Sequence, residues 1–270
     1  MGGGAGRVVR REGLEIAYWR EGAGRPVVWI QGLNADHTAW TSQIIAFRDG
    51  YDCISPDNRD VGRSGRASAP YTLAEMAEDV RAVLDDAAVD DAHVVGLSLG
   101  GAIAQELALH SPEWVRSLTL VSTFARPDAR LEAVLEAWRA IYPVLGPSDF
   151  ARQSWPWLLS WRFFERPANL RNLQRYADNA PHPQESDAFR RQAAVTLGQD
   201  RRDRLAALTM PTLVVAGGDD ALVPPYLGRE LAEAIPGARY VELPGVGHSA
   251  NLEGRGEFNR LVRGFLDAQG

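Results

Sequence analysis

The chain has 270 residues, of which 45% are hydrophobic and 24% are charged, as in an ordinary globular protein. This length allows one large domain or two small ones, with a core large enough to fold without disulfides or metal. The net charge is −6 and the arginines are scattered, which excludes the concentrated basic face of a nucleic-acid-binding protein.

The chain carries one cysteine, Cys53, so no internal disulfide can form. Because Cys53 lies in the short apolar run "YDCIS", we expect an inert thiol in a buried strand. The segment "MGGGAGRVVRR" lacks the apolar stretch of a signal peptide, and no apolar run approaches the length of a membrane span. We therefore expect a cytoplasmic protein with no membrane partner, and a homo-oligomer is compatible with the sequence.

Strand signals dominate the N-terminal part of the chain. Residues 7–11 and 14–22 predict an antiparallel pair with Gly13 at the turn. Residues 25–32 and 51–57 are apolar runs, which predicts strands that are covered on both faces.

Helical periodicity first appears in residues 72–89, whose apolar side chains fall on one face. Thr72 and Glu75 form a capping box at the start of this helix. A strand, a helix and a strand are then predicted at 92–98, 99–111 and 117–123. This alternation predicts βαβ units and a parallel sheet with helices on both faces.

The alternation stops after Thr123 and resumes near residue 212. The intervening segment predicts helices that are broken at Pro143, Pro147, Pro156, Pro167, Pro181 and Pro183. We therefore predict an α/β fold with a mostly parallel central sheet and flanking helices. Residues 1–124 and 206–270 form its core, and residues 125–205 form an inserted helical cap.

The stretch Gly96-Leu97-Ser98-Leu99-Gly100 stands where a predicted buried strand turns into a helix. A chain that reverses this sharply crowds its own backbone, so the glycines at both ends of the stretch fit the turn. The turn would expose the Ser98 hydroxyl at the carboxyl edge of the sheet, beside the free N–H groups of a helix. The pattern predicts a catalytic serine.

A serine is a poor nucleophile unless a base takes its proton and an acid orients the base. The expected chain order is serine, acid, histidine. A predicted strand ends in Asp219 and Asp220, and a second one ends in a loop that carries His248. Ser98, one of these two aspartates and His248 are therefore the candidate catalytic residues.

Five segments of the chain resemble the α/β-hydrolase family: "WIQGLNADHTAW", "PDNRDVGRS", "VVGLSLGGAIAQELAL", "GGDDALVPP" and "GVGHSANLE". The resemblance covers essentially the whole chain, and the insert matches the position of the family's helical cap. Within the family, the chain is similar to small bacterial esterases, the 3-oxoadipate enol-lactonase group, anthracycline methylesterases and cofactor-free haloperoxidases.

The resemblance implies that Ser98 is the nucleophile and His248 the general base. The family places the acid three residues before a Val-Pro pair, which favours Asp220, with Asp219 as the alternative. The implied oxyanion hole consists of the backbone N–H groups of Leu33 and Leu99.

The loop that carries Leu33 departs from the family pattern. The family usually has His-Gly where this chain has Gln31-Gly32. The substitution changes the hydrogen bonding behind the oxyanion hole and leaves its backbone donors in place.

The remaining polar and aromatic candidates have simpler interpretations. The other histidines are predicted on the surface or on helices: His37, His93, His110 and His182. They lack the spacing of metal ligands, so no metal is expected. Asp57, Arg59 and Asp60 are predicted to brace a loop. The predicted cap contains six aromatic residues: Trp138, Trp155, Trp157, Trp161, Phe163 and Phe164. We expect most of them to pack in the interior and one or two to contact the substrate.

The expected function is hydrolysis of a small, fairly apolar carboxylic ester or lactone, without a cofactor. Dehalogenases and epoxide hydrolases of this family use an aspartate nucleophile, so Ser98 argues against them. Three alternatives stay open: cleavage of a C–C bond, cofactor-free perhydrolysis on the same triad, and a small-molecule receptor built on a hydrolase fold.

Overall fold

The computed structural model describes residues 6–270, and their strands form a single sheet in the order β1-β2-β4-β3-β5-β6-β7-β8. The strands are β1 (Arg7–Arg11), β2 (Leu14–Gly22), β3 (Arg25–Ile30), β4 (Tyr51–Pro56), β5 (Ala92–Leu97), β6 (Val115–Val121), β7 (Thr212–Gly217) and β8 (Arg239–Leu243). β1 and β2 pair antiparallel, as do β2 and β4, and all other neighbours are parallel. The predicted α/β fold with a mostly parallel sheet is confirmed.

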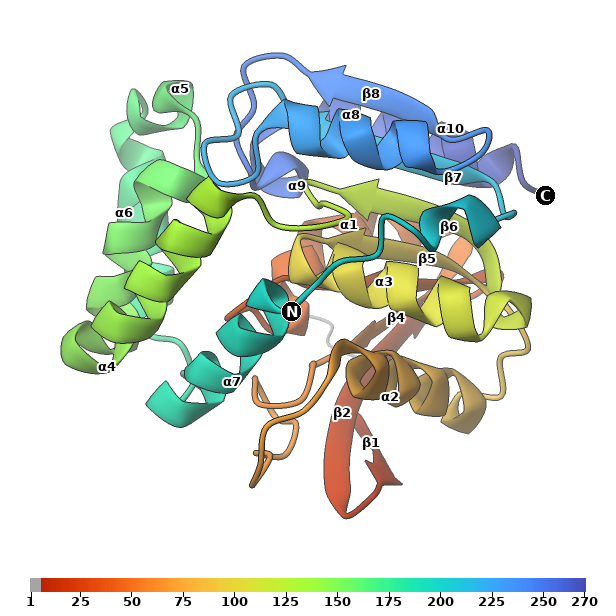
Figure 1. The fold of residues 1–270 in the computed structure, drawn as a ribbon, viewed down its shortest axis with the longest axis horizontal. Helices are drawn as coiled ribbons and strands as arrows, with labels where there is room; N and C mark the ends of the chain where they lie inside the picture. Colours follow the sequence, from red (N-terminus) through yellow and green to blue (C-terminus); the bar gives the residue numbers. More distant parts are fainter. Residues whose placement is uncertain (1–5) are drawn as a thin grey trace.

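Helices cover both faces of this sheet (Figure 1). One face carries α2 (Leu73–Asp86), α3 (Leu99–His110) and α8 (Pro225–Ala234), and the other carries α1 (Thr41–Phe47) and α10 (Arg255–Asp267). Short helices η1 (His37–Trp40), η2 (Pro112–Trp114), η3 (Leu205–Ala207) and α9 (Ala250–Glu253) lie in the connections. Because both faces are covered, the central parallel strands β4, β5 and β7 are buried along almost their whole length.

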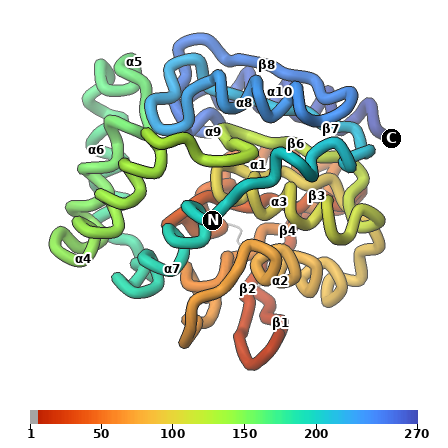
Figure 2. The backbone as a smooth tube through the Cα atoms, viewed as in Figure 1, coloured from red at the N-terminus to blue at the C-terminus, as the bar shows by residue number. Residues whose placement is uncertain are grey.

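A group of helices between β6 and β7 lies at the carboxyl edge of the sheet, at the left in Figure 1. We call these helices the helical insert: α4 (Ala129–Leu158), α5 (Trp161–Phe164), α6 (Pro167–Asp178) and α7 (Ser186–Leu197). Figure 2 follows the chain out of β6, through the insert and back to β7. The insert has its own apolar cluster, which includes Trp138, Tyr142, Phe150 and Phe189. The division into a core and a cap with the boundaries given above stays a prediction.

The breaks predicted at Pro143 and Pro156 are wrong, because α4 continues through both residues. The backbone leaves helical geometry at Gly146, where φ is 72° and ψ is 173°, directly before Pro147, at which a break is predicted. A proline inside a helix loses one hydrogen bond and costs about 3 kcal/mol. The stacked and edge-on rings of Tyr142, Phe150 and Phe189, with centroids 4.0–5.0 Å apart, offset part of that cost.

Cys53 is buried in β4, as predicted, and burial raises the pKa of its thiol to about 12. The surface or helix position predicted for His93 is wrong, because His93 is fully buried in strand β5. Its Nδ1 lies 2.8 Å from the hydroxyl of Ser117 on β6, which satisfies one ring nitrogen. In residues 6–270, no helix combines the length and apolar character that a membrane crossing needs.

Candidate active site

Ser98 lies at a sharp turn between β5 and α3. Its backbone has φ 55° and ψ −118°, a region that side-chain-bearing residues rarely adopt. Such a conformation costs on the order of 1–3 kcal/mol and persists where neighbouring contacts hold it. Here the Ser98 N–H donates to the Val121 carbonyl (2.9 Å), and the Ser98 carbonyl accepts from the Thr123 hydroxyl (2.7 Å).

Close backbone contacts surround this turn. A Cβ on Gly100 would lie 2.1 Å from the carbonyl oxygen of Ile30, so only glycine fits there. A Cβ on Gly32 would lie 3.2 Å from the Cβ of Ser98. The loop that follows β3 therefore passes directly beside the serine, as the predicted oxyanion hole requires.

His248 and Asp220 form a buried pair at the ends of two neighbouring strands. Asp220 follows β7 and His248 follows β8, and Nδ1 of the histidine lies 2.8 Å from Oδ2 of the aspartate. The other carboxylate oxygen, Oδ1, accepts hydrogen bonds from the backbone N–H groups of Leu222 (2.9 Å) and Val223 (2.8 Å). Asp219 is exposed, so of the two aspartates it is Asp220 that contacts His248.

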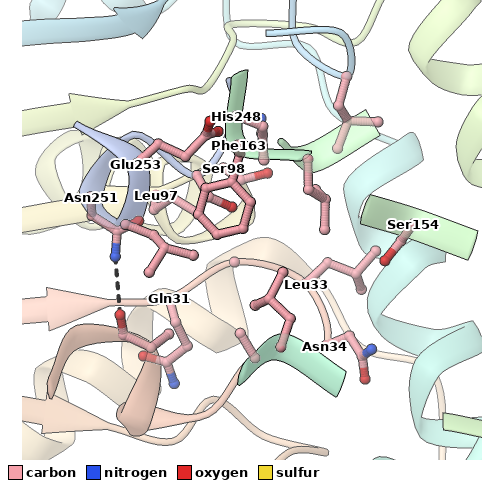
Figure 3. Close-up of a pocket in the computed structure, with 18 of the residues that line it drawn as sticks. Gln31, Leu33, Asn34, Leu97, Ser98, Ser154, Phe163, His248, Asn251 and Glu253 are labelled. Atoms are coloured by element: carbon pink, nitrogen blue, oxygen red, sulfur yellow. Dashed lines mark hydrogen bonds between the residues drawn. The ribbon is translucent and has the colours of Figure 1, made fainter. Parts of the chain in front are cut away.

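Ser98 and His248 line one cavity of about 1170 Å³ between the sheet edge and the helical insert. Figure 3 draws them among the residues that line it, together with Leu33 and Asn34 of the loop after β3. Ser98 has 9% of its surface exposed and His248 has 3%, so protein atoms surround most of both polar side chains. Such an environment strengthens electrostatic interactions.

The insert contributes much of the apolar wall. Of the six aromatics predicted in the cap, Trp138 and Phe163 line the cavity, in agreement with the expectation that one or two would. The sequence analysis missed five other aromatic residues of the wall: Trp40, Phe124, Phe150, Tyr176 and Phe189. Three exposed arginines, Arg162, Arg166 and Arg255, also line it.

The two predicted oxyanion donors belong to different elements. Leu99 is the first residue of α3, where N–H groups have no acceptor within the helix. Leu33 lies in the loop after β3 and lines the cavity. Gln31, which replaces the usual histidine, is 1% exposed and donates from Nε2 to the carbonyl of Pro56 (2.6 Å). The backbone carbonyl of Gln31 accepts a hydrogen bond from Nδ2 of Asn58 (3.0 Å).

Glu253, which the sequence analysis did not single out, holds the loop that carries His248. Its carboxylate accepts from the N–H groups of Gly247 (3.0 Å) and Ser160 (3.1 Å) and from the Ser160 hydroxyl. Burial raises the pKa of the Glu253 carboxyl, against the opposing effect of these hydrogen bonds. Since Ser160 follows α4, this carboxylate also ties the insert to the histidine loop.

Residues Asp57, Arg59 and Asp60 brace a loop, as predicted. Asp57 accepts from the backbone N–H of His37 (2.8 Å), and the Arg59 guanidinium contacts both carboxylate oxygens of Asp79 (2.6 and 2.8 Å). Within residues 6–270, no group of three or more His, Cys, Asp or Glu side chains is arranged to hold a metal ion.

A family model described as "alpha/beta hydrolase fold" matches residues 25–255. The chain is 37% identical over 252 residues to "Putative carbamate hydrolase RutD" of Azorhizobium caulinodans, covering 93% of this chain and 94% of that protein. It is 32% identical over 276 residues to "Rhodomycin D methylesterase DauP" of Streptomyces sp. strain C5, covering 88% and 91%. The solved structure of the enol-lactonase from Burkholderia xenovorans LB400 matches with a TM-score of 0.88 at 26% identity, covering 97% of this chain and 100% of that one. The chain therefore belongs to the family of proteins with the α/β-hydrolase fold.

Proposed function

We propose that this protein is a serine hydrolase that cleaves a small, fairly apolar carboxylic ester or lactone. One observation carries the proposal: the strained Ser98 lines the same largely apolar cavity as His248, whose Nδ1 contacts the buried Asp220. A serine at a strand-to-helix turn that lines a cavity, a histidine held by a carboxylate and nearby backbone donors are the parts that acyl transfer needs.

In the proposed mechanism, Oγ of Ser98 attacks the carbonyl carbon of the substrate while Nε2 of His248 takes the hydroxyl proton. The negative charge that forms on the carbonyl oxygen is held by the N–H groups of Leu33 and Leu99. The tetrahedral intermediate then collapses to an acyl-enzyme, and His248 protonates the departing alcohol. A water molecule, deprotonated by His248, attacks the acyl-enzyme, and the acid leaves.

Asp220 has two tasks in this mechanism. Its contact with Nδ1 of His248 selects the tautomer whose Nε2 is free to accept the proton of Ser98. Its negative charge stabilises the imidazolium that forms during each proton transfer. The reaction as written needs no cofactor.

The similar proteins support this substrate class. One relative is named a methylesterase, and one solved structure is an enol-lactonase. Both names describe acyl–oxygen cleavage, and the apolar residues of the wall here suit a small organic acyl group.

Hydrolysis of an anionic carbamate is a second candidate. A relative named a carbamate hydrolase is 37% identical, and Arg162, Arg166 and Arg255 line the cavity without forming an ion pair within residues 6–270. Guanidinium groups at the mouth of a cleft raise the local concentration of a negatively charged substrate.

The test is hydrolysis of p-nitrophenyl esters, acetate through octanoate, by the wild-type protein and by Ser98→Ala. We expect multiple turnovers by the wild-type protein and a loss of more than about a thousandfold in kcat for the variant. A p-nitrophenyl hemisuccinate in the same panel carries a free carboxylate. A higher kcat/KM for it than for the neutral butyrate, falling with added salt, would favour the anionic substrate class.

Equal activity of Ser98→Ala and the wild-type protein would contradict the mechanism. Absence of turnover for every ester would contradict the proposed substrate class, and tight product binding without turnover would then support a receptor. Halide oxidation that requires both peroxide and a carboxylate would support perhydrolysis.

A further inference from the structure

The loop between β3 and η1, residues 31–36, carries the proposed oxyanion donor Leu33, and we call it the oxyanion loop. Its two ends are fastened to the core. Gln31 is held by Pro56 and Asn58 at one end, and the backbone N–H of His37 donates to Asp57 at the other (2.8 Å). The middle of the loop is held from the helical insert.

That contact joins Asn34 to Gln192 of helix α7. The backbone N–H of Asn34 donates to Oε1 of Gln192 at 3.3 Å, across 158 residues of sequence. Asn34 has a φ of 61°, in the left-handed region, so the chain turns sharply directly after Leu33. A turn in this region persists where outside contacts hold it, and Gln192 supplies such a contact.

Gln192 is itself rigidly placed. Its side chain is fully buried, and its Oε1 also accepts from Nε2 of Gln184 (3.1 Å). Its Nε2 donates to the backbone carbonyl of Arg59 (3.0 Å). The neighbouring Arg191 forms two hydrogen bonds of 2.8 Å to the carboxylate of Asp60, which docks α7 on the core.

We propose that Gln192 is a positioning residue that holds the oxyanion loop from the helical insert and thereby fixes the direction of the Leu33 N–H. This inference rests on the proposed function. Oxyanion donors act when they lie about 2.7–3.1 Å from the developing charge, so a small rotation of the loop weakens them. Gly32 has no side chain to resist such a rotation, and Gln192 restrains the loop on the other side of Leu33.

A purely structural role would give a different pattern. If Gln192 only docked α7 on the core, then any residue of the same network would have the same effect when replaced. Gln184 provides the matched control, because it is buried, it contacts Gln192 and the carbonyl of Asp60, and its side chain forms no hydrogen bond to the oxyanion loop.

The experiment compares Gln192→Met with Gln184→Met, since methionine keeps the volume of glutamine and lacks its polar atoms. Thermal unfolding first verifies that both variants are folded. For Gln192→Met we expect a fall in kcat of about tenfold with KM changed by less than about twofold, because the oxyanion forms only after substrate binds. For Gln184→Met we expect kcat within about twofold of the wild-type value.

A second readout does not depend on turnover. Attack of Ser98 on a fluorophosphonate also places charge on an oxygen in the oxyanion hole, so labelling by Gln192→Met should slow by a factor similar to that in kcat. If Gln192→Met does not fold at the assay temperature, the same comparison uses Gln192→Asn and Gln184→Asn. The side chain of Gln192→Asn is one methylene shorter, which draws its amide oxygen away from the backbone N–H of Asn34.

Two outcomes overturn the inference alone: unchanged kcat and labelling in Gln192→Met, or equal losses in the two variants. Labelling of wild-type Ser98 without turnover of any ester contradicts the proposed substrate class and leaves the comparison of labelling rates decisive. Absence of labelling in the wild-type protein contradicts both the proposed nucleophile and the role of Gln192.

Discussion

Asp219 and Asp220 are adjacent in sequence and differ completely in surroundings. Asp219 faces solvent, whereas Asp220 is 4% exposed and uses both carboxylate oxygens, one on His248 and one on two backbone N–H groups. The backbone bonds fix the carboxylate so that it presents Oδ2 to the imidazole. Sequence pattern favours Asp220, but only the fold brings it against the histidine.

Replacing Asp220 by asparagine should therefore damage catalysis far more than replacing its neighbour. Asp220→Asn keeps the size of the side chain and removes the charge that, in the proposed mechanism, selects the tautomer of His248 and stabilises its protonated form. We expect kcat to fall by about 10⁴, the order seen for such replacements in serine hydrolases. Asp219→Asn is the control and should retain kcat within about threefold. Similar losses in both variants, measured with p-nitrophenyl butyrate, would contradict the assignment.

His93 is a buried histidine that the proposed chemistry does not use. Burial lowers its pKa to about 4 from 6.5, and the charges of Arg116 and Arg25 act in the same direction. The folded protein therefore keeps His93 neutral at pH values where the unfolded chain takes up a proton. This difference stabilises the fold above pH 6.5 and is lost as the pH falls from 6.5 toward 4.

The contribution of His93 is measurable by urea unfolding at several pH values. We expect the free energy of unfolding to fall by up to about 1.4 kcal/mol per pH unit through this range because of His93. His93→Asn keeps a polar atom near the hydroxyl of Ser117 and should flatten that slope. Exposed His182→Asn is the control. An unchanged slope in His93→Asn would show that other groups cause the acid sensitivity.

At the scale of elements, the site depends on how closely α3 approaches β3. The apolar runs and their bounding turn residues were sufficient to predict these strands and helices, because each is a local pattern of side chains. The elbow at Ser98 was predictable for the same reason. Local patterns did not predict the continuation of α4 through Pro143 and Pro156, because aromatic packing within the insert overrides the preference of proline.

Two glycine substitutions test the close approach of α3. In Gly100→Ala the new Cβ would meet the backbone oxygens of Ile30 and Gln31 at 2.1 and 2.7 Å, and backbone cannot repack as a side chain does. We expect a loss of about 3 kcal/mol or more in the free energy of unfolding.

Gly264→Ala, in helix α10, is the control for this loss. Gly264 is exposed and has no neighbour within 4 Å of the built Cβ, so alanine should raise the stability by about 0.5–1 kcal/mol. Equal effects of the two substitutions on urea unfolding would contradict the packing described here.

At the scale of the molecule, the helical insert forms one wall of the cavity and also makes hydrogen bonds to the loops around it. Gln192 contacts the oxyanion loop, and Glu253 joins the loop that carries His248 to Ser160, which lies between α4 and α5. Neither residue could be identified from sequence, since its partners lie far away in the chain and no spacing marks them. The serine, aspartate and histidine were predictable as candidates because strand ends in a parallel sheet meet at one edge.

The central claim is that Ser98 is the nucleophile of an acyl-transfer site. Its most direct test is to label the wild-type protein with a fluorophosphonate and to locate the adduct by peptide mass spectrometry. We expect one adduct per chain, on Ser98, with esterase activity lost in proportion to labelling, and no adduct in Ser98→Ala. An adduct on another residue, or full esterase activity after complete labelling of Ser98, would contradict the account.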